Sequence, residues 1–160
     1  MNRLIFVVVA MLIALASSAV AHADRGVRPA EPAGSYMVSI VKQKLDNDYA
    51  TAWSTLYPPH QRVASLEAYV ACESLVPSPG TLVGVTVMRT FNERIHVAGR
   101  PKKVRTRAVR VRVSVSLPDF PLFPVVVDQT FHAVAVKRHW RWILSPDQYE
   151  NYRAGVCPYS

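Results

Sequence analysis

The spacing of hydrophobic residues changes twice along this chain. Residues 4–20 are an almost unbroken apolar run, residues 35–75 carry apolar positions at helical spacing, and residues 81–144 carry them at the spacing of strands. The helical and strand regions are separated along the chain. We therefore expect an α+β domain in which N-terminal helices pack on a curved antiparallel sheet.

Two amphipathic helices are predicted ahead of the strands. Ser35 is a suitable N-cap for the first, and the prolines Pro58 and Pro59 end it. Ser65 is a suitable N-cap for the second, which runs to Leu75. The first helix has one apolar face, which we expect to be buried in the curve of the sheet.

Four strands are predicted after Gly80. They cover residues 81–97, 104–117, 125–136 and 140–144, with a loop at 118–124 and a tight reversal at 137–139. Ser145-Pro146-Asp147 then opens a last helical turn that runs through Tyr149, Tyr152 and Arg153.

The second strand has an irregular alternation. Its apolar residues move from even to odd positions at Ala108 and Val109. Because a shift of one residue exchanges the two faces of a strand, we expect a β-bulge there that keeps one face buried. With this bulge, the four arginines of the strand point to the same outer face: Arg105, Arg107, Arg110 and Arg112.

The first 23 residues have the organisation of a secretory signal peptide. Arg3 gives a positive start, the apolar run follows, and Ala21-His22-Ala23 has the small-x-small pattern that signal peptidase recognises. The apolar run is also at the lower limit of a membrane span, so an uncleaved anchor is the alternative. We expect cleavage, a flexible leader at 24–34, one domain at 35–160, and a secreted or cell-envelope location.

Two cysteines, Cys72 and Cys157, would enter an oxidising compartment after export. They allow one intramolecular pairing, which we predict as a disulfide that holds the C-terminal tail. Two distant cysteines without paired histidines do not make a zinc ligand set, so no metal is expected.

Basic residues are concentrated in the strand region. The chain has a net charge of +8, and residues 95–113 include seven Lys or Arg and no acidic residue. Arginines that alternate along a strand are about 7 Å apart, a spacing that suits repeating anionic groups. The alternative is a solvated face whose charges prevent edge pairing. The candidate anion-binding residues are Lys102, Lys103, Arg105, Arg107, Arg110 and Arg112.

No catalytic motif is recognisable, and no cofactor is expected, because glycine-rich phosphate loops and nucleophile elbows are absent from the sequence. Asp128 and His132 share the more polar face of their strand, but four residues separate them by about 13 Å, which is too far for a direct dyad. We interpret both as solvent-facing or structural. His60, in the turn at residues 58–61, is expected to hydrogen-bond a neighbouring backbone group and to fix the corner between the helices.

Residues 46–61, DNDYATAWSTLYPPHQ, resemble the first-helix signature of the NTF2-like (cystatin-like) superfamily. Residues 69–72, 140–144 and 152–158 extend the resemblance to small exported actinobacterial proteins of that type. The resemblance implies a cone-shaped α+β barrel with a pocket between the helix and the concave sheet. Aromatic residues that belong to the core or line this pocket, and one neighbouring histidine, are Tyr49, Trp53, Tyr69, Phe131 and His132.

The superfamily includes isomerases, dehydratases, epoxide hydrolases, scaffolds and binding modules, so the fold alone does not give the function. We expect a non-catalytic binding module of the cell envelope. Its partner would be an anionic polymer, a lipid headgroup or an acidic protein, and not a nucleic acid. The alternatives are a small-molecule enzyme of the isomerase or hydrolase type, and an assembly protein that forms a homodimer across its sheet. A deep cavity with a buried carboxylate or histidine would favour the enzyme.

Overall fold

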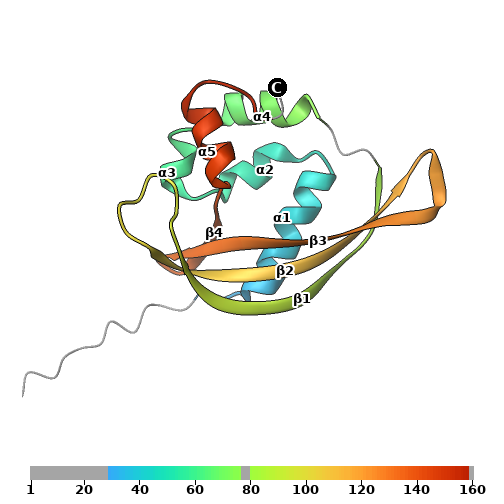
Figure 1. Ribbon diagram of the computed structural model, residues 1–160, viewed down its shortest axis with the longest axis horizontal. Helices are drawn as coiled ribbons and strands as arrows, with labels where there is room; N and C mark the ends of the chain where they lie inside the picture. Colours follow the sequence, from blue (N-terminus) through green and yellow to red (C-terminus); the bar gives the residue numbers. More distant parts are fainter. Residues whose placement is uncertain (1–28, 77–79, 159–160) are drawn as a thin grey trace, which may run out of the picture.

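The computed structural model describes residues 29–76 and 80–158, so the predicted signal peptide lies outside the described residues. They form a mixed α+β fold with a curved four-stranded antiparallel sheet in the order β1-β2-β3-β4, as predicted (Figure 1). This architecture is compatible with an NTF2-like fold. The elements are α1 Ala33–Leu45, α2 Tyr49–Ser54, α3 Pro58–Gln61, α4 Leu66–Ser74, β1 Thr81–Ile95, β2 Val104–Leu117, β3 Phe120–Val136, β4 His139–Trp142 and α5 Pro146–Arg153.

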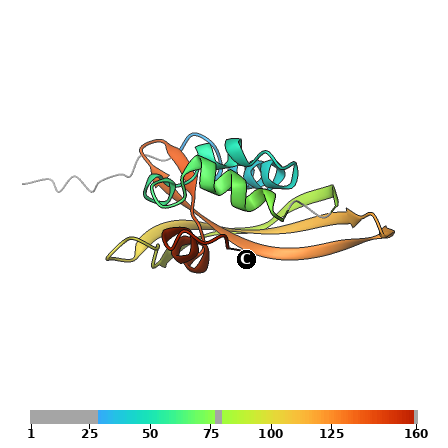
Figure 2. The ribbon, with the colours of Figure 1, turned by 90° about the horizontal axis from the view of Figure 1, so that it is seen from above.

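The helices gather over one part of the sheet. Figures 1 and 2 show that the turn joining β2 to β3 extends well beyond them. The segment at Leu56 continues the sheet past β4 through a parallel bridge to Trp142. The sheet is therefore covered at one end and projects freely at the other.

The first helical segment consists of two helices, so the prediction of one continuous helix was wrong. α1 begins two residues before the expected cap, Ser35, and ends ahead of Asn47, whose φ of 59° is incompatible with a helix interior. Asp48 then caps α2 by accepting a hydrogen bond from the Thr51 backbone N–H at 3.2 Å. Asparagine tolerates the left-handed conformation and aspartate is a favoured N-cap, so this polar run breaks the helix.

Serine caps begin the two later helices. Ser65 accepts from the backbone N–H of Ala68 at 3.2 Å, as expected for the start of α4. Ser145 and Gln148 form a reciprocal capping box at the start of α5, with bonds of 3.1 and 3.2 Å.

The expected bulge in β2 is absent. Residues 107–115 of β2 pair with β3 without a shift, and the pairing with β1 is also continuous through Ala108 and Val109. The irregularities lie in β1, where Val83 and Met88 are the additional residues.

Without a bulge in β2, its arginines cannot all face the same side. Alternate residues of a regular strand point to opposite faces. Arg105 and Arg107 share a face with Val109, whereas Arg110 and Arg112 lie on the other face. The predicted single stripe of four arginines was wrong.

Both faces of the sheet are covered, but at different places, and this explains the irregular alternation of β2. On one face Val109 and Val111 belong to the main core beneath the helices. On the other face Val104 packs against a second cluster that contains Tyr57 and Val134. The change from even to odd apolar positions marks the point at which the covered face changes.

β3 begins at Phe120, earlier than the expected residue 125. Residues 118–119 form the turn, and residues 121–124 are an irregular stretch before regular pairing with β2 resumes. Because β4 pairs only with residues 133–136, this part of β3 is a sheet edge in the described structure. Prolines are tolerated at such an edge, which is why they did not prevent a strand here.

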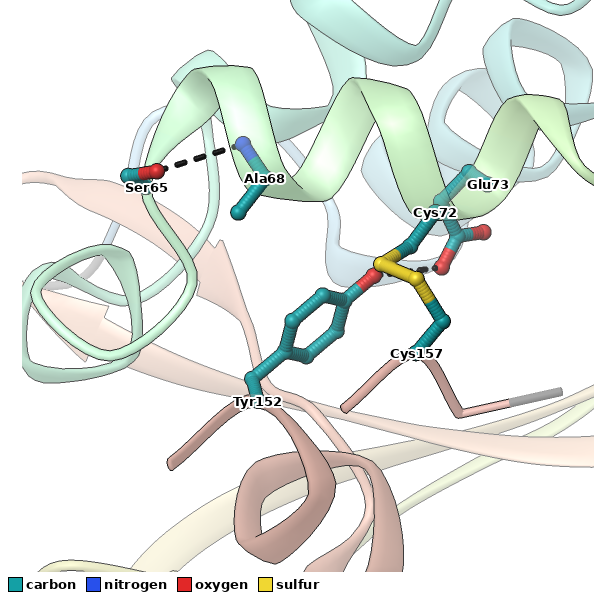
Figure 3. Close-up of a disulfide and its surroundings, with 6 residues drawn as sticks. All are labelled: Ser65, Ala68, Cys72, Glu73, Tyr152 and Cys157. Carbon is teal, nitrogen blue, oxygen red and sulfur yellow. Dashed lines mark hydrogen bonds between the residues drawn. A yellow bond between two sulfur atoms is a disulfide. The ribbon is translucent and has the colours of Figure 1, made fainter. Parts of the chain in front are cut away.

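The predicted disulfide joins Cys72 of α4 to Cys157 after α5, with 5.2 Å between the Cα atoms (Figure 3). Beside it the Tyr152 hydroxyl donates to Glu73 at 3.2 Å, and Glu73 pairs with Lys44 at 3.4 Å. The C-terminal helix is thus held to α4 both covalently and by a buried hydrogen bond.

Replacing both cysteines by alanine (C72A/C157A) should lower the free energy of unfolding by up to about 4–5 kcal/mol, because the bridge closes a long loop in the unfolded chain. Urea unfolding followed by circular dichroism measures the change. Wild-type protein treated with a reductant should show the same loss. Equal urea midpoints for oxidised and reduced wild type would contradict this role.

Candidate functional site

Four of the five predicted pocket residues belong to the main core. Tyr49 and Tyr69 are buried, and Trp53 and Phe131 pack against the same cluster. The indole N–H of Trp53 also donates to the carbonyl of Ala64 at 2.7 Å. These aromatic side chains fill the space between the helices and the sheet.

The fifth predicted pocket residue, His132, does not join the other four. It lies on the opposite face of β3 from Phe131, and its Nε2 is 2.9 Å from a carboxylate oxygen of Glu93. Both partners are at the surface. The pair therefore joins β3 to β1 across β2 and lies outside the core.

Asp128 is on the same face as His132 but has its own partners. Arg112 donates to its two carboxylate oxygens at 2.7 and 2.9 Å, and Arg110 approaches at 3.4 Å. The hydrogen bonds from Arg112 lower the pKa of the Asp128 carboxyl, and the same contact raises the pKa of Arg112. Asp128 is held by Arg112, and His132 contacts Glu93 separately, so the two residues form no dyad.

His60 is fully buried and uses both ring nitrogens in structural hydrogen bonds. Its Nε2–H donates to the carbonyl of Ala98 at 3.1 Å, and its Nδ1 accepts from the backbone N–H of Leu144 at 3.0 Å. His60 does bond backbone groups, but these belong to Ala98 and Leu144 in distant segments, so the prediction that it fixes the corner between the helices was wrong. Burial lowers the pKa of His60, and protonation of Nδ1 would break the bond from Leu144.

The buried carboxylate of Glu73 is also engaged. In addition to Tyr152, it pairs with Lys44, whose ammonium lies 4.8 Å from the centroid of the Trp142 ring. Burial lowers the pKa of Lys44, while Glu73 opposes this shift. The acidic and basic groups of the interior thus hold the helices and the sheet together.

Exposed positive charge gathers at the β1–β2 hairpin. Arg94 and Arg105 stand directly opposite each other on adjacent strands, and both are exposed. Among the described residues, neither forms an ion pair. Arg107 is on the same face and donates to Asn92 at 2.9 Å. We call Arg94, Arg105 and Arg107 the arginine cluster.

Two further candidates, Lys102 and Lys103, are exposed in the connection that precedes β2. The structure therefore places four of the six predicted anion-binding residues near one hairpin, and the other two, Arg110 and Arg112, beside Asp128. Arg94 was missed, although the hairpin register counted outward from the turn at Gly99 would have placed it opposite Arg105.

A groove of about 580 Å³ lies on another side of the molecule, between α1 and the β3–β4 turn. None of the predicted pocket residues lines it. Its lining comes mainly from α1 and from the β3–β4 turn, which lie far apart in the sequence. The side-chain oxygen of Gln43 is buried there without a hydrogen-bond partner among the described residues. The main lining residues are Tyr36, Ile40, Gln43, Arg138, His139 and Arg141.

Within residues 29–76 and 80–158, no group of three His, Cys, Asp or Glu side chains is placed to hold a metal ion. None of the helices in these residues is long and apolar enough to cross a membrane.

His60 should make stability depend on pH. Its pKa in the folded protein is below the ordinary value of 6.5, so between these two values the unfolded chain binds more protons. The free energy of unfolding should therefore decrease as the pH falls through this window. His60→Gln should remove this component and cost about 1–3 kcal/mol near neutral pH, because buried backbone groups lose partners.

Urea unfolding of wild type, His60→Gln and the exposed control His139→Gln across this pH range tests the prediction. The control should keep the wild-type pH profile. If His60→Gln has the same profile as wild type, the buried imidazole does not control acid stability.

Comparison with known proteins adds no functional assignment: the chain matches no protein-family model, and no curated protein matches it significantly.

Proposed function

We propose that this protein is an exported NTF2-like domain that serves as a non-catalytic binding module of the cell envelope. Its ligand would be anionic and would bind at the arginine cluster. The observation that carries the proposal is the pair of exposed arginines, Arg94 and Arg105, that stand directly opposite each other on adjacent strands.

Like charges directly opposite each other weaken a β-ladder. A phosphate or carboxylate placed between two guanidinium groups would remove that repulsion and accept several charge-assisted hydrogen bonds. Arg107, on the same face and next along β2, extends the positive surface in the direction of the strand. This arrangement suits a ligand with more than one anionic group, such as an envelope polymer, a lipid surface or an acidic protein.

The interior gives less support to the enzyme alternative. An acid–base catalyst needs a titratable group that can reach a substrate. The buried groups with suitable chemistry, His60 and Glu73, have protein partners at their hydrogen-bonding atoms. Aromatic side chains occupy the space between helices and sheet where the resemblance implied a pocket.

Export is proposed from the signal-peptide pattern of residues 1–23 and is supported by the disulfide. Disulfides persist in oxidising compartments, and this one closes the fold across 85 residues. Membership of the NTF2-like superfamily is proposed from the resemblance of residues 46–61, together with a compatible fold of helices on a curved antiparallel sheet.

The variant R94Q/R105Q should lower the affinity for anionic probes at least about tenfold, because hydrogen bonds to charged groups contribute about 1.5–3 kcal/mol each. The probes are polyglutamate, polyphosphate, and vesicles of phosphatidylglycerol and phosphatidylcholine. Binding is measured by sedimentation at low and high salt, since screening should weaken it. The three probes separate carboxylate, phosphate and lipid-surface ligands.

The matched control is R110Q/R112Q, which removes the same number of charges from arginines that Asp128 already holds. It should reduce binding much less than R94Q/R105Q. Absence of salt-dependent binding by the wild-type protein to every probe would refute the proposed function. Equal losses in the two variants would show that net charge, and not the arginine cluster, determines binding.

A further inference from the structure

We propose that the outer edge of β3, from residue 122 to residue 132, pairs antiparallel with the same edge of a second copy of this chain. The two sheets would then form one continuous sheet across a twofold axis. This inference concerns a different surface from the arginine cluster and does not depend on the proposed function.

The β3 edge is open over a long stretch. On its inner side β3 pairs with β2, but on its outer side β4 reaches only residues 133–136. Residues 122–132 therefore have no outer strand neighbour in the described structure. Figures 1 and 2 show the end of this edge near the β2–β3 turn projecting beyond the helices, so another chain could approach it there. An exposed strand edge of this length is a template for pairing with another chain.

The opposite edge of the sheet has features that prevent pairing along its length, whereas on β3 such features, Pro124 and the irregular residues 121–124, are confined to the end near the β2–β3 turn. β1 is interrupted by extra residues at Val83 and Met88 and carries Arg89 and Arg94. Bulges and positive charges are common devices that keep edge strands apart. Residues 125–131 of β3 contain no Lys, Arg or Pro and pair with β2 without a shift. The two edges of the sheet are therefore not equivalent, and β3 is the one suited to pairing.

Apolar side chains on the β3 edge are unusually exposed. They are Leu122 at 83%, Phe123 at 77%, Val125 at 43%, Val126 at 54% and Val127 at 51%. Together they expose on the order of 500 Å², against the ~800 Å² that each partner contributes to a stable interface. The strand backbone and the polar residues up to 132 would supply the rest. A second copy paired at this edge would cover part of these apolar side chains and satisfy the open backbone groups of the strand.

The register follows from the length of the open edge. Pairing that uses residues 122–132 of both copies is centred on Val127, which then faces Val127 of the partner subunit. In this register Phe123 lies opposite Phe131 of the partner subunit, and such aromatic pairs stabilise sheets. The acidic residue of the edge, Asp128, is already neutralised by Arg112 of its own chain. The pairing therefore brings no bare like charges together.

Sedimentation equilibrium of the form that lacks residues 1–23 should give a dimer. Val127→Lys places two ammonium groups opposite each other at the twofold axis and should raise the dimer dissociation constant at least about tenfold. Val83→Lys is the matched control, because it introduces the same charge at an exposed valine on the opposite edge. It should leave the dimer unchanged. Thermal unfolding shows that both variants fold.

Val127→Cys tests the register separately. Directly opposite residues of an antiparallel pair have Cα atoms about 4.5–5.5 Å apart, within the range that a disulfide spans. Under mild oxidation this variant should form a covalent dimer, and Val83→Cys should not. A wild-type monomer at about 100 µM would refute the proposal. A dimer that Val127→Lys leaves intact, or a monomer whose exposed edge residues bind lipid vesicles instead, would also refute it.

Discussion

The uninterrupted pairing of β2 with β3 decides which side of the sheet each neighbouring side chain faces. A strand without a bulge sends successive residues to opposite faces, and β2 keeps this alternation from Arg105 to Val115. As a result the strand contributes valines to the main core on one face and Val104 to a second cluster on the other. The same alternation separates Arg105 and Arg107 from Arg110 and Arg112. The two cores and the two groups of arginines thus have one physical cause.

The interior and the surface of this domain differ in how they use polar chemistry. Inside, His60 joins two chain segments through its two ring nitrogens, and Glu73 joins α4 to α1 and α5. A buried polar group that lost these partners would cost free energy, so such groups contribute to a unique arrangement of the helices. At the surface, Arg94 and Arg105 have charge that no described acidic residue balances. The proposed binding site therefore lies at the surface and not in the interior.

The sequence predicted those features that depend on neighbouring residues. Ser65 was recognised as a helix cap, the four strands were located, and the two cysteines could pair only with each other. The sequence also contained a helix break that the prediction of one continuous helix overlooked, at Asn47 and Asp48. Local sequence patterns gave correct predictions of structure where a residue type has one common structural role, as Ser65 has at the start of a helix.

By itself, the sequence determined the α+β class and the order of helices and strands, because periodicity and capping residues act over short distances. It also determined the disulfide, because a single pair of cysteines allows only one solution. Only the tertiary structure decided which face of the sheet each β2 residue occupies and that Arg94 stands opposite Arg105. It also decided that His132 lies apart from the aromatic core and that the edge of β3 is open. These properties depend on strand register and on which element covers each face. A one-residue shift of β2 or β3 would exchange the faces of its side chains while leaving the local sequence pattern unchanged.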